Sequence, residues 1–200
     1  MPQLDLAGLT AVPKGKVAAV VTSLEMTERP DLKPPNPPAG IDLRLVDAPE
    51  GDWYRSLFRA VGGDWLWSSR LRLDDGELAA ILADRGVEVH VVRANGVEIG
   101  LLELGFRTAG VAEISFFGIV PGHRGKGLGR WMMDEALTRA WREGIGRVWL
   151  HTSTLDSPVA LPFYRSRGFV PFSFQIEVID DPRLTGLLPR SAAPQVAILE

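Results

Sequence analysis

The pattern of apolar and polar residues along the chain alternates between stretches typical of strands and stretches typical of helices. Residues 16–26 form the first predicted strand, and both of its faces are largely apolar, as is typical of a strand that lies within a sheet or is covered. Further strands are predicted where apolar and polar residues alternate, and helices where apolar residues recur every three or four positions. The other predicted strands cover residues 41–46, 87–93, 97–106, 111–120, 147–152 and 169–179, and the predicted helices cover residues 49–62, 74–86, 127–143 and 157–167.

Turn signals and prolines divide the chain into parts. Asn95-Gly96, between two strand patterns, predicts a two-residue hairpin turn. Residues 29–40 contain five prolines and predict a stiff, extended connector. We therefore predict an N-terminal extension with one strand over residues 1–40, a main domain over residues 41–180 and a C-terminal tail over residues 181–200.

Residues 111–129 carry the strongest indication of function. An apolar strand pattern runs into a basic, glycine-rich turn and then into an amphipathic helix pattern, an order that favours binding of a polyphosphate by free backbone N–H groups. A Walker loop is excluded because Val120 stands at its first glycine position and Gly127 follows Lys126 where Ser or Thr is needed. A dinucleotide fingerprint is excluded because Arg130 stands at its third glycine position.

Two motifs resemble those of the GNAT superfamily of acyl-CoA-dependent N-acyltransferases. Arg124-x-x-Gly127-x-Gly129 is similar to the pyrophosphate loop of that superfamily, and residues 160–169, which contain Tyr164, are similar to its second signature. The chain also resembles members of a bacterial subgroup of this superfamily, the substrate of which is unknown. The resemblance implies an α+β class and the GNAT fold, with a central mixed, mostly antiparallel twisted sheet of about seven strands. In that fold helices flank the sheet, and strands 4 and 5 splay apart.

The resemblance implies acetyl-CoA as the cofactor. Its diphosphate is expected on the glycine-rich turn, mainly through backbone N–H groups, and its pantetheine arm in the gap between the splayed strands. Ser157 stands where many relatives carry Asn, so its contact to the amide arm of the cofactor is an open expectation. The expected cofactor-binding residues are Phe117, Gly118, Ile119 and Val120 for the arm, Arg124, Gly125, Lys126, Gly127, Leu128 and Gly129 for the diphosphate, and Ser157.

Two residues are the candidates for proton transfer. Glu113 lies in an otherwise apolar strand, where burial raises the pKa of a carboxyl and makes it a better base. Asp156, His151 and a water chain stay open as alternative bases. Tyr164 is the expected acid, because a phenol can donate a proton to the leaving thiolate. Pro162 is expected to remove one helical hydrogen bond and to kink the helix that carries the tyrosine.

The acceptor pocket is expected between the first two helices of the main domain and the strand at residues 147–152. Trp65 and Trp67 would clamp an apolar or cationic acceptor there, although packing of both rings in the core is an equal alternative. His151 and Asp156 are expected to line the same pocket. No metal site is predicted, because the three histidines are isolated.

Composition narrows the class of protein. A net charge of −3 and an isoelectric point near 5.7 argue against nucleic acid or an anionic membrane as the main partner. The absence of cysteine excludes disulfides, thiolate metal sites and a cysteine nucleophile. No signal peptide and no stretch long enough to span a bilayer is apparent, so a cytoplasmic location is expected.

These observations predict an acetyl-CoA-dependent N-acetyltransferase that moves the acetyl group directly from the thioester to a primary amine of a small molecule or peptide. A non-catalytic acyl-CoA-binding sensor and an acyltransferase for longer acyl-CoA are the alternatives. The strand at residues 16–26 could complete the sheet within the chain or pair with a second subunit, so a homodimer stays open.

Overall fold

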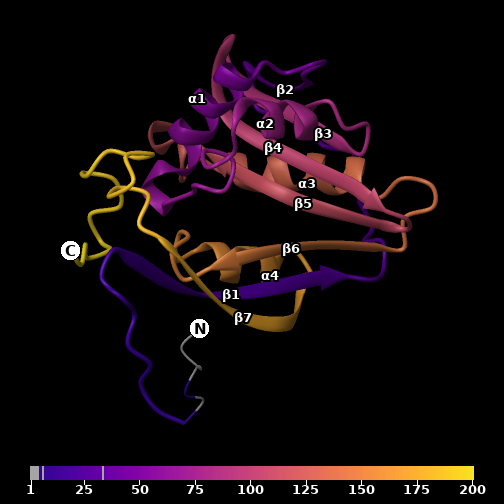
Figure 1. Ribbon diagram of the computed structural model, residues 1–200. Helices are drawn as coiled ribbons and strands as arrows, with labels where there is room; N and C mark the ends of the chain where they lie inside the picture. The colour runs from indigo at the N-terminus through magenta and orange to yellow at the C-terminus, as the bar shows by residue number, and fades with distance from the viewer. Residues whose placement is uncertain (1–4, 6, 33) are drawn as a thin grey trace.

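A seven-stranded open sheet forms the centre of the computed structural model, which describes residues 5, 7–32 and 34–200 (Figure 1). The strand order is β2-β3-β4-β5-β6-β1-β7; β5 and β6 run parallel, and every other neighbouring pair is antiparallel. This arrangement confirms the predicted fold class. The strands are β1 (Lys16–Met26), β2 (Ile41–Leu45), β3 (Val87–Ala94), β4 (Val97–Thr108), β5 (Val111–Ile119), β6 (Arg147–Ser153) and β7 (Val170–Asp180).

Helices cover both faces of the sheet. On one face α1 (Gly51–Gly62) and α2 (Asp75–Leu82) bury Tyr54, Phe58 and Leu78 against β3 and β4. On the other face α3 (Leu128–Ala140) and α4 (Ala160–Ser166) form a second core that includes Met132 and Phe169. Figure 1 shows α1 and α2 in front of the sheet and α3 behind it. Two short 3-10 turns, η1 (Gly63–Trp65) and η2 (Pro121–His123), complete the elements.

Local signals explain most element ends. Asp74 caps α2 because its side chain accepts a hydrogen bond from the N–H of Glu77, whose own side chain bonds back to Asp74. Asn95 and Gly96 both have positive φ, 49° and 84°, as a type I′ hairpin turn requires. The structure ends α2 at Leu82 and α3 at Ala140, a few residues before the predicted ends, because helix ends fray into turns.

The strand of the predicted extension is an interior strand of the sheet. β1 pairs with β6 on one side and with β7 on the other, so that Thr22 lies between Thr152 and Phe174. The structure therefore places β1 within the chain's own sheet rather than against a second subunit. Residues 1–4, 6 and 33 of the predicted extension lie outside the described residues.

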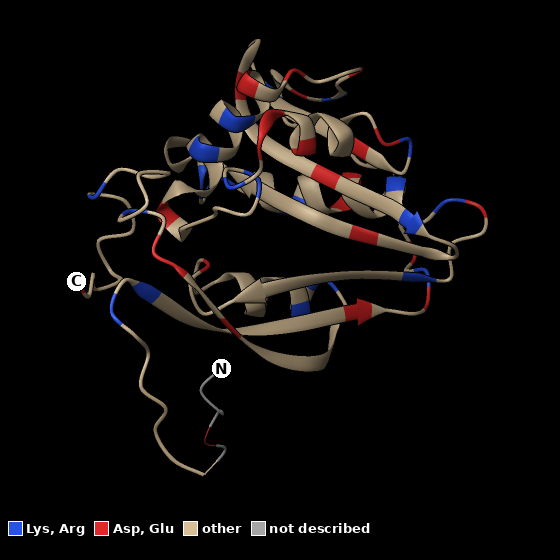
Figure 2. Ribbon diagram, viewed as in Figure 1, with Lys and Arg blue, Asp and Glu red and all other residues tan. Residues whose placement is uncertain are grey.

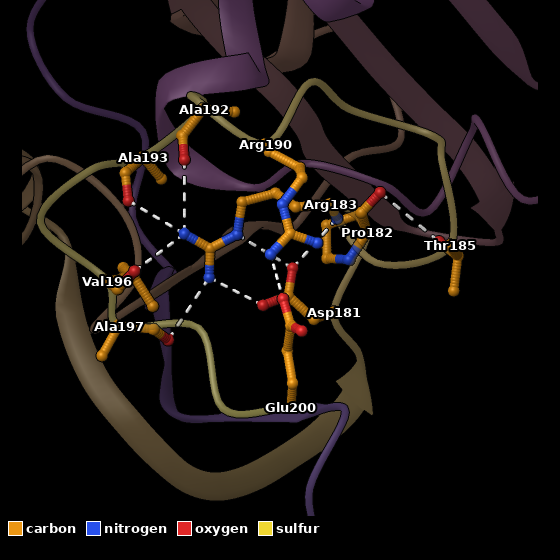
Figure 3. A network of polar contacts seen from close by, with 10 residues as sticks. All are labelled: Asp181, Pro182, Arg183, Thr185, Arg190, Ala192, Ala193, Val196, Ala197 and Glu200. Atoms are coloured by element: carbon orange, nitrogen blue, oxygen red, sulfur yellow. Dashed lines mark hydrogen bonds and ion pairs between the residues drawn. The ribbon is translucent and has the colours of Figure 1, made fainter.

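The C-terminal segment after β7 packs against the α1 face of the molecule. Leu188 and Ala193 are buried in the same core as Val17 and Phe58. Arg183, almost fully buried, pairs with Asp181 and donates hydrogen bonds to backbone carbonyls of residues 192, 193, 196 and 197 (Figure 3). This buried guanidinium satisfies carbonyl groups that an irregular segment would otherwise leave unpaired.

The predicted splay occurs between β5 and β6, the fourth and fifth strands counted from residue 41. Their parallel pairing is limited to Val111 with Arg147, Ala112 with Val148, and Glu113 with Trp149. Beyond that point each strand keeps its other neighbour, β4 or β1, and the two separate. The gap opens toward the start of α3, next to the glycine-rich turn.

Candidate active site

A cavity of about 570 Å³ occupies the gap between β5 and β6. Its walls come from five regions: the end of β5, the turn before α3, the end of α1 with the segment after it, β6 with the start of α4, and β1 with β7. Thirteen of the predicted site residues line it: Trp65, Trp67, Phe117, Gly118, Ile119, Arg124, Gly125, Gly127, Gly129, His151, Asp156, Ser157 and Tyr164. The fold therefore brings together residues as far apart in the chain as Trp65 and Tyr164.

The turn before α3 presents a run of free backbone donors. Within the described part of the chain, the N–H groups of residues 125–129 have no hydrogen-bond acceptor. Gly125 and Gly127 have φ of +75° and +80°, a conformation that other residues adopt only with strain. Leu128 is the first residue of α3, so the helix dipole adds positive potential at the same point. The donors and the dipole fit a diphosphate such as that of acetyl-CoA.

The two cationic side chains of this turn are engaged within the protein. The guanidinium of Arg124 donates to the carbonyls of Ile119 (2.8 Å) and Val61 (3.0 Å) and to Asp64 (2.8 Å), and it stacks on Trp65. Lys126 Nζ donates to the carbonyl of Gly122 at 2.9 Å. Arg124 thus joins the end of β5 to the segment after α1, and the anion-binding capacity of the turn resides in its amides.

β5 offers some of its backbone groups to the gap and uses others in the sheet. The N–H of Val120 donates to the carbonyl of Ile99 (2.8 Å), on the β4 side. Successive residues of a strand direct their N–H and C=O groups to opposite sides. The backbone groups of Gly118 therefore also point toward β4, whereas those of Phe117 and Ile119 point into the gap. The carbonyl of Ile119 accepts a hydrogen bond from Arg124. The N–H and C=O of Phe117 and the N–H of Ile119 therefore remain for a ligand to bind.

Gly118 is required by packing. A Cβ atom at this position would lie 2.4 Å from Cγ1 of Val61 and 3.3 Å from the ring of Trp67. Helix α1 and the indole therefore press directly on the backbone of β5. This close approach sets the width of the cavity on that side.

Tyr164 is held in α4 by an aromatic cluster. Its ring contacts those of Phe117, Phe163 and Phe169, with centroids 5.5 to 6.3 Å apart, and the residue is 8% exposed. Among the described residues its hydroxyl has no hydrogen-bond partner, and the residue lines the cavity. Burial, followed by the charge of Asp156, raises the pKa of the phenol, so it stays protonated at neutral pH.

The expectation that Pro162 kinks the helix is wrong. α4 begins at Ala160, so Pro162 is its third residue and lies in the first turn, where backbone N–H groups have no intrahelical partner. The proline therefore costs no helical bond. Ser157 precedes the helix; its carbonyl accepts from the N–H of Ala160 (2.8 Å), and the residue lines the cavity.

Glu113 lies outside the main cavity. It lines a separate hollow of about 80 Å³ with Glu103, Arg107 and Trp149, and Ser115 borders both spaces. Burial raises the pKa of the Glu113 carboxyl, the nearby charge of Glu103 adds to this, and His151 and two arginines oppose it. Any proton transfer from the cavity to Glu113 must pass through Ser115, His151 or a water molecule.

Asp156 anchors the wall of the acceptor side. Its Oδ1 accepts from Trp67 Nε1 (3.0 Å), and its Oδ2 accepts from Thr152 Oγ1 and from the N–H of Ser153, both at 2.8 Å. Three donors thus contact these two oxygens, so Asp156 holds the indole of Trp67 against the end of β6. Trp67 also packs on Phe58 and Phe116, so the ring belongs to the core and to the cavity wall at once.

His151 is exposed on β6, lines the cavity and lies beside Trp149, with ring centroids 6.1 Å apart. Val120, Lys126 and Leu128 are the remaining predicted cofactor residues, and they do not line the cavity with their side chains. Leu128 is buried in the core beneath the turn. Within the described ranges no group of three or more His, Cys, Asp or Glu residues could hold a metal ion.

Sequence reasoning missed several cavity residues. Ser115 and Phe116 follow Glu113 on the same strand, and Arg130 follows the glycine-rich turn, so proximity in sequence was an available signal. Others carried none, because they reach the cavity only through the long-range pairing of β1 and β7. The missed residues include Val21, Arg72, Ser115, Phe116, Arg130, Ser153, Glu177 and Ile179.

Comparison with known proteins agrees with this geometry. Residues 51–169, more than half of the chain, match the model of the acetyltransferase (GNAT) family. A segment of 51 residues is 43% identical to streptothricin acetyltransferase of Streptomyces lavendulae, and this covers 26% of each protein. No helix of the described residues is long and apolar enough to cross a membrane.

Solved structures show the same fold. A conserved protein of unknown function from Staphylococcus epidermidis superposes with a TM-score of 0.59 at 17% identity, over 84% of this chain and 63% of the other. A GCN5-related N-acetyltransferase from Kribbella flavida has a TM-score of 0.54 at 22% identity, over 86% and 63%. The chain thus spans less than two thirds of the length of these relatives. With its family match, its sheet and its glycine-rich turn before α3, the chain belongs to the acetyltransferase (GNAT) family.

Proposed function

We propose that the protein transfers the acetyl group of acetyl-CoA directly to a primary amine of a small molecule or peptide. The N–H groups of residues 125–129, which have no acceptor among the described residues, carry this proposal, because such a run of donors fits the diphosphate of the donor. Gly125, Gly127 and Gly129 of this turn line the cavity. The partial similarity to an acetyltransferase named for streptothricin supports a small-molecule acceptor. An acyl-CoA donor is consistent with a cytoplasmic reaction.

The acceptor amine must lose a proton before it attacks. For an amine with a pKa of about 10.4, neutralisation at pH 7 costs roughly 4.6 kcal/mol, and for an α-amine near pKa 8 it costs about 1.4 kcal/mol. A general base in the protein is therefore most valuable for a lysine-like amine. We assign this role to Glu113, reached from the cavity through one water molecule or through Ser115, with His151 as the alternative.

The thioester supplies an activated acetyl group, and the protein supplies the proton that the departing sulfur needs. We assign that proton to the hydroxyl of Tyr164, which lines the cavity and has no competing partner among the described residues. The nitrogen forms a bond to the carbonyl carbon, the carbon–sulfur bond breaks, and the sulfur receives a proton from Tyr164. Trp65 and Trp67 line the same cavity and would hold the acceptor.

Calorimetric titration with acetyl-CoA, followed by a screen of amines for release of free thiol, tests the function. We expect binding at micromolar to millimolar concentration and thiol release with at least one amine class. Absence of binding at millimolar acetyl-CoA would contradict the proposal. Binding without thiol release across a broad amine panel would indicate a sensor module instead.

Gly127→Val is expected to weaken acetyl-CoA binding by about tenfold or more. A non-glycine residue at φ +80° costs roughly 1–2 kcal/mol, and relief of this strain turns the amides away from the anion. Gly144→Val is the matched control, since Gly144 has φ +83°, is exposed and does not line the cavity. Equal affinities of the two variants, measured by calorimetry, would argue against the turn as the diphosphate site.

Glu113→Gln is expected to lower kcat/KM by about a hundredfold and to remove the acidic limb of its pH profile. The active form of a general base is the carboxylate, so activity falls as the pH drops through the pKa of Glu113, which burial places above its usual 4.5. His151→Gln is the comparison. If the acidic limb disappears in this variant and persists in Glu113→Gln, the base is His151.

A further inference from the structure

An ion pair joins the glycine-rich turn to the short 3-10 turn η1 that follows α1. The guanidinium of Arg124 donates a hydrogen bond to Oδ2 of Asp64 at 2.8 Å, and the two side chains are 29% and 48% exposed respectively. The two residues are 60 positions apart in the chain. Figure 2 shows acidic and basic residues close together around α1 and the segment that follows it. The positive charge of Arg124 is therefore balanced by the protein itself.

The guanidinium of Arg124 is fixed on several sides. Its Nε and Nη2 donate to the carbonyls of Ile119 and Val61, at 2.8 and 3.0 Å, in addition to the bond from Nη1 to Asp64. Its central carbon lies 5.0 Å from the centre of the Trp65 ring. Each nitrogen thus makes one hydrogen bond within the protein. Movement of the guanidinium toward a diphosphate would break all three bonds, of which the one to Asp64 is charged at both ends and is the strongest.

The C-terminal segment supports the backbone of Asp64. The side-chain amide of Gln195 donates a hydrogen bond to the carbonyl of Asp64 at 2.9 Å, and Figure 1 shows the C-terminal segment beside the segment after α1. Gln195 lies between residues 193 and 196, whose carbonyls accept hydrogen bonds from the buried guanidinium of Arg183 (Figure 3). Asp64 is therefore held by its backbone on one segment and presents its carboxylate to another.

Arg124 stands directly before the donors of the glycine-rich turn. Its own N–H donates to the carbonyl of Pro121 at 3.2 Å, and residues 125–129 follow with N–H groups that have no acceptor within the described ranges. A fixed residue at the start of this run orients the amides that follow it, and donors that are already oriented bind a ligand more tightly than donors that must first be ordered. Asp64 does not line the cavity, so it acts on this site only through Arg124.

We propose that Asp64 is a positioning residue of the donor site: it fixes Arg124 and thereby keeps the amides of residues 125–129 in the geometry that binds the diphosphate. The inference rests on the proposed use of acetyl-CoA. It predicts the opposite of the simple charge effect, because removal of a negative charge close to the turn would otherwise strengthen the binding of an anion. The same ion pair keeps Trp65, a residue of the cavity wall, against the turn.

Calorimetric titration of the parent and its variants with acetyl-CoA tests the proposal. Asp64→Ala is expected to weaken binding by about fivefold, and Arg124→Ala by about tenfold or more. The double variant is expected to bind within about twofold of Arg124→Ala, because Asp64 acts only through that guanidinium. Asp42→Ala is the matched control and is expected to leave the affinity unchanged. Asp42 pairs with Arg93 at 2.9 Å, its side chain is 44% exposed, and neither residue lines the cavity.

Tighter binding by Asp64→Ala would overturn the proposal, because it would show that Asp64 competes with the diphosphate for Arg124. Unchanged binding, equal weakening by Asp42→Ala, or additive losses in the double variant would also overturn it. A parent that does not bind acetyl-CoA would overturn the proposed function itself, which the variants do not test.

Thermal unfolding separates an effect on the turn from an effect on the whole fold. The side chain of Asp64 is about half exposed, so the melting temperature of Asp64→Ala is expected to stay within a few degrees of that of the parent. Asp64→Asn is the second substitution. It keeps an oxygen that can accept from Arg124 and removes only the charge, so it is expected to weaken acetyl-CoA binding less than Asp64→Ala does. An Asp64→Asn variant that binds more tightly than the parent would contradict the proposal in the same way.

Discussion

Replacement of Tyr164 by phenylalanine is expected to lower turnover by about a hundredfold or more, while acetyl-CoA affinity changes by less than about twofold. The ring contacts with Phe117, Phe163 and Phe169 survive the substitution, so only the hydroxyl is lost. Burial raises the pKa of this phenol, so the hydroxyl carries its proton at neutral pH. Steady-state kinetics and calorimetry measure the two quantities separately.

The chain offers a matched control in its other tyrosine. Tyr54 lies on α1 and is fully buried against the sheet, and its hydroxyl donates to Glu103 rather than facing the cavity. Tyr54→Phe is expected to reduce the free energy of unfolding by about 1–2 kcal/mol with little change in kcat for the folded protein. If Tyr164→Phe retains the turnover of the parent, the tyrosine is not the acid.

Deletion of residues 1–28 is expected to abolish folding of the whole domain. The deletion removes β1, which pairs with β7 over residues 16–25 and with β6 over residues 21–26. It also removes the buried side chains of Val17, Leu24 and Met26. β7 would lose its only neighbour in the sheet, and β6 would expose an unpaired edge. We expect insoluble protein, or soluble protein without a cooperative thermal transition by circular dichroism.

Deletion of residues 1–10 is the control for that experiment. It stops before β1 and is expected to shift the melting temperature by only a few degrees. A cooperative transition in the longer deletion, at a temperature close to that of the parent, would show that β1 is dispensable for the sheet.

The sequence by itself determined the order of the helices and strands and the local turns and caps, because these depend on residues close together in the chain. The hairpin at Asn95-Gly96 and the cap at Asp74 depend on residues a few positions apart, and both are present. The glycine-rich turn at residues 125–129 is equally local, because positive φ at two glycines and a helix start are encoded within one segment. The position of Tyr164 at the cavity followed from a motif that spans ten residues.

The tertiary structure alone decided what depends on contacts between distant segments. No local pattern could place β1 between β6 and β7, because strand pairing across more than one hundred residues is selected by the packing of the whole sheet. Arg124 is a second case, because its guanidinium donates hydrogen bonds to Val61 and Asp64, sixty residues away. Glu113 is a third, because the separation of β5 and β6 leaves its side chain in a separate hollow. The sequence determined which groups are present, and long-range packing determined which of them face the cavity.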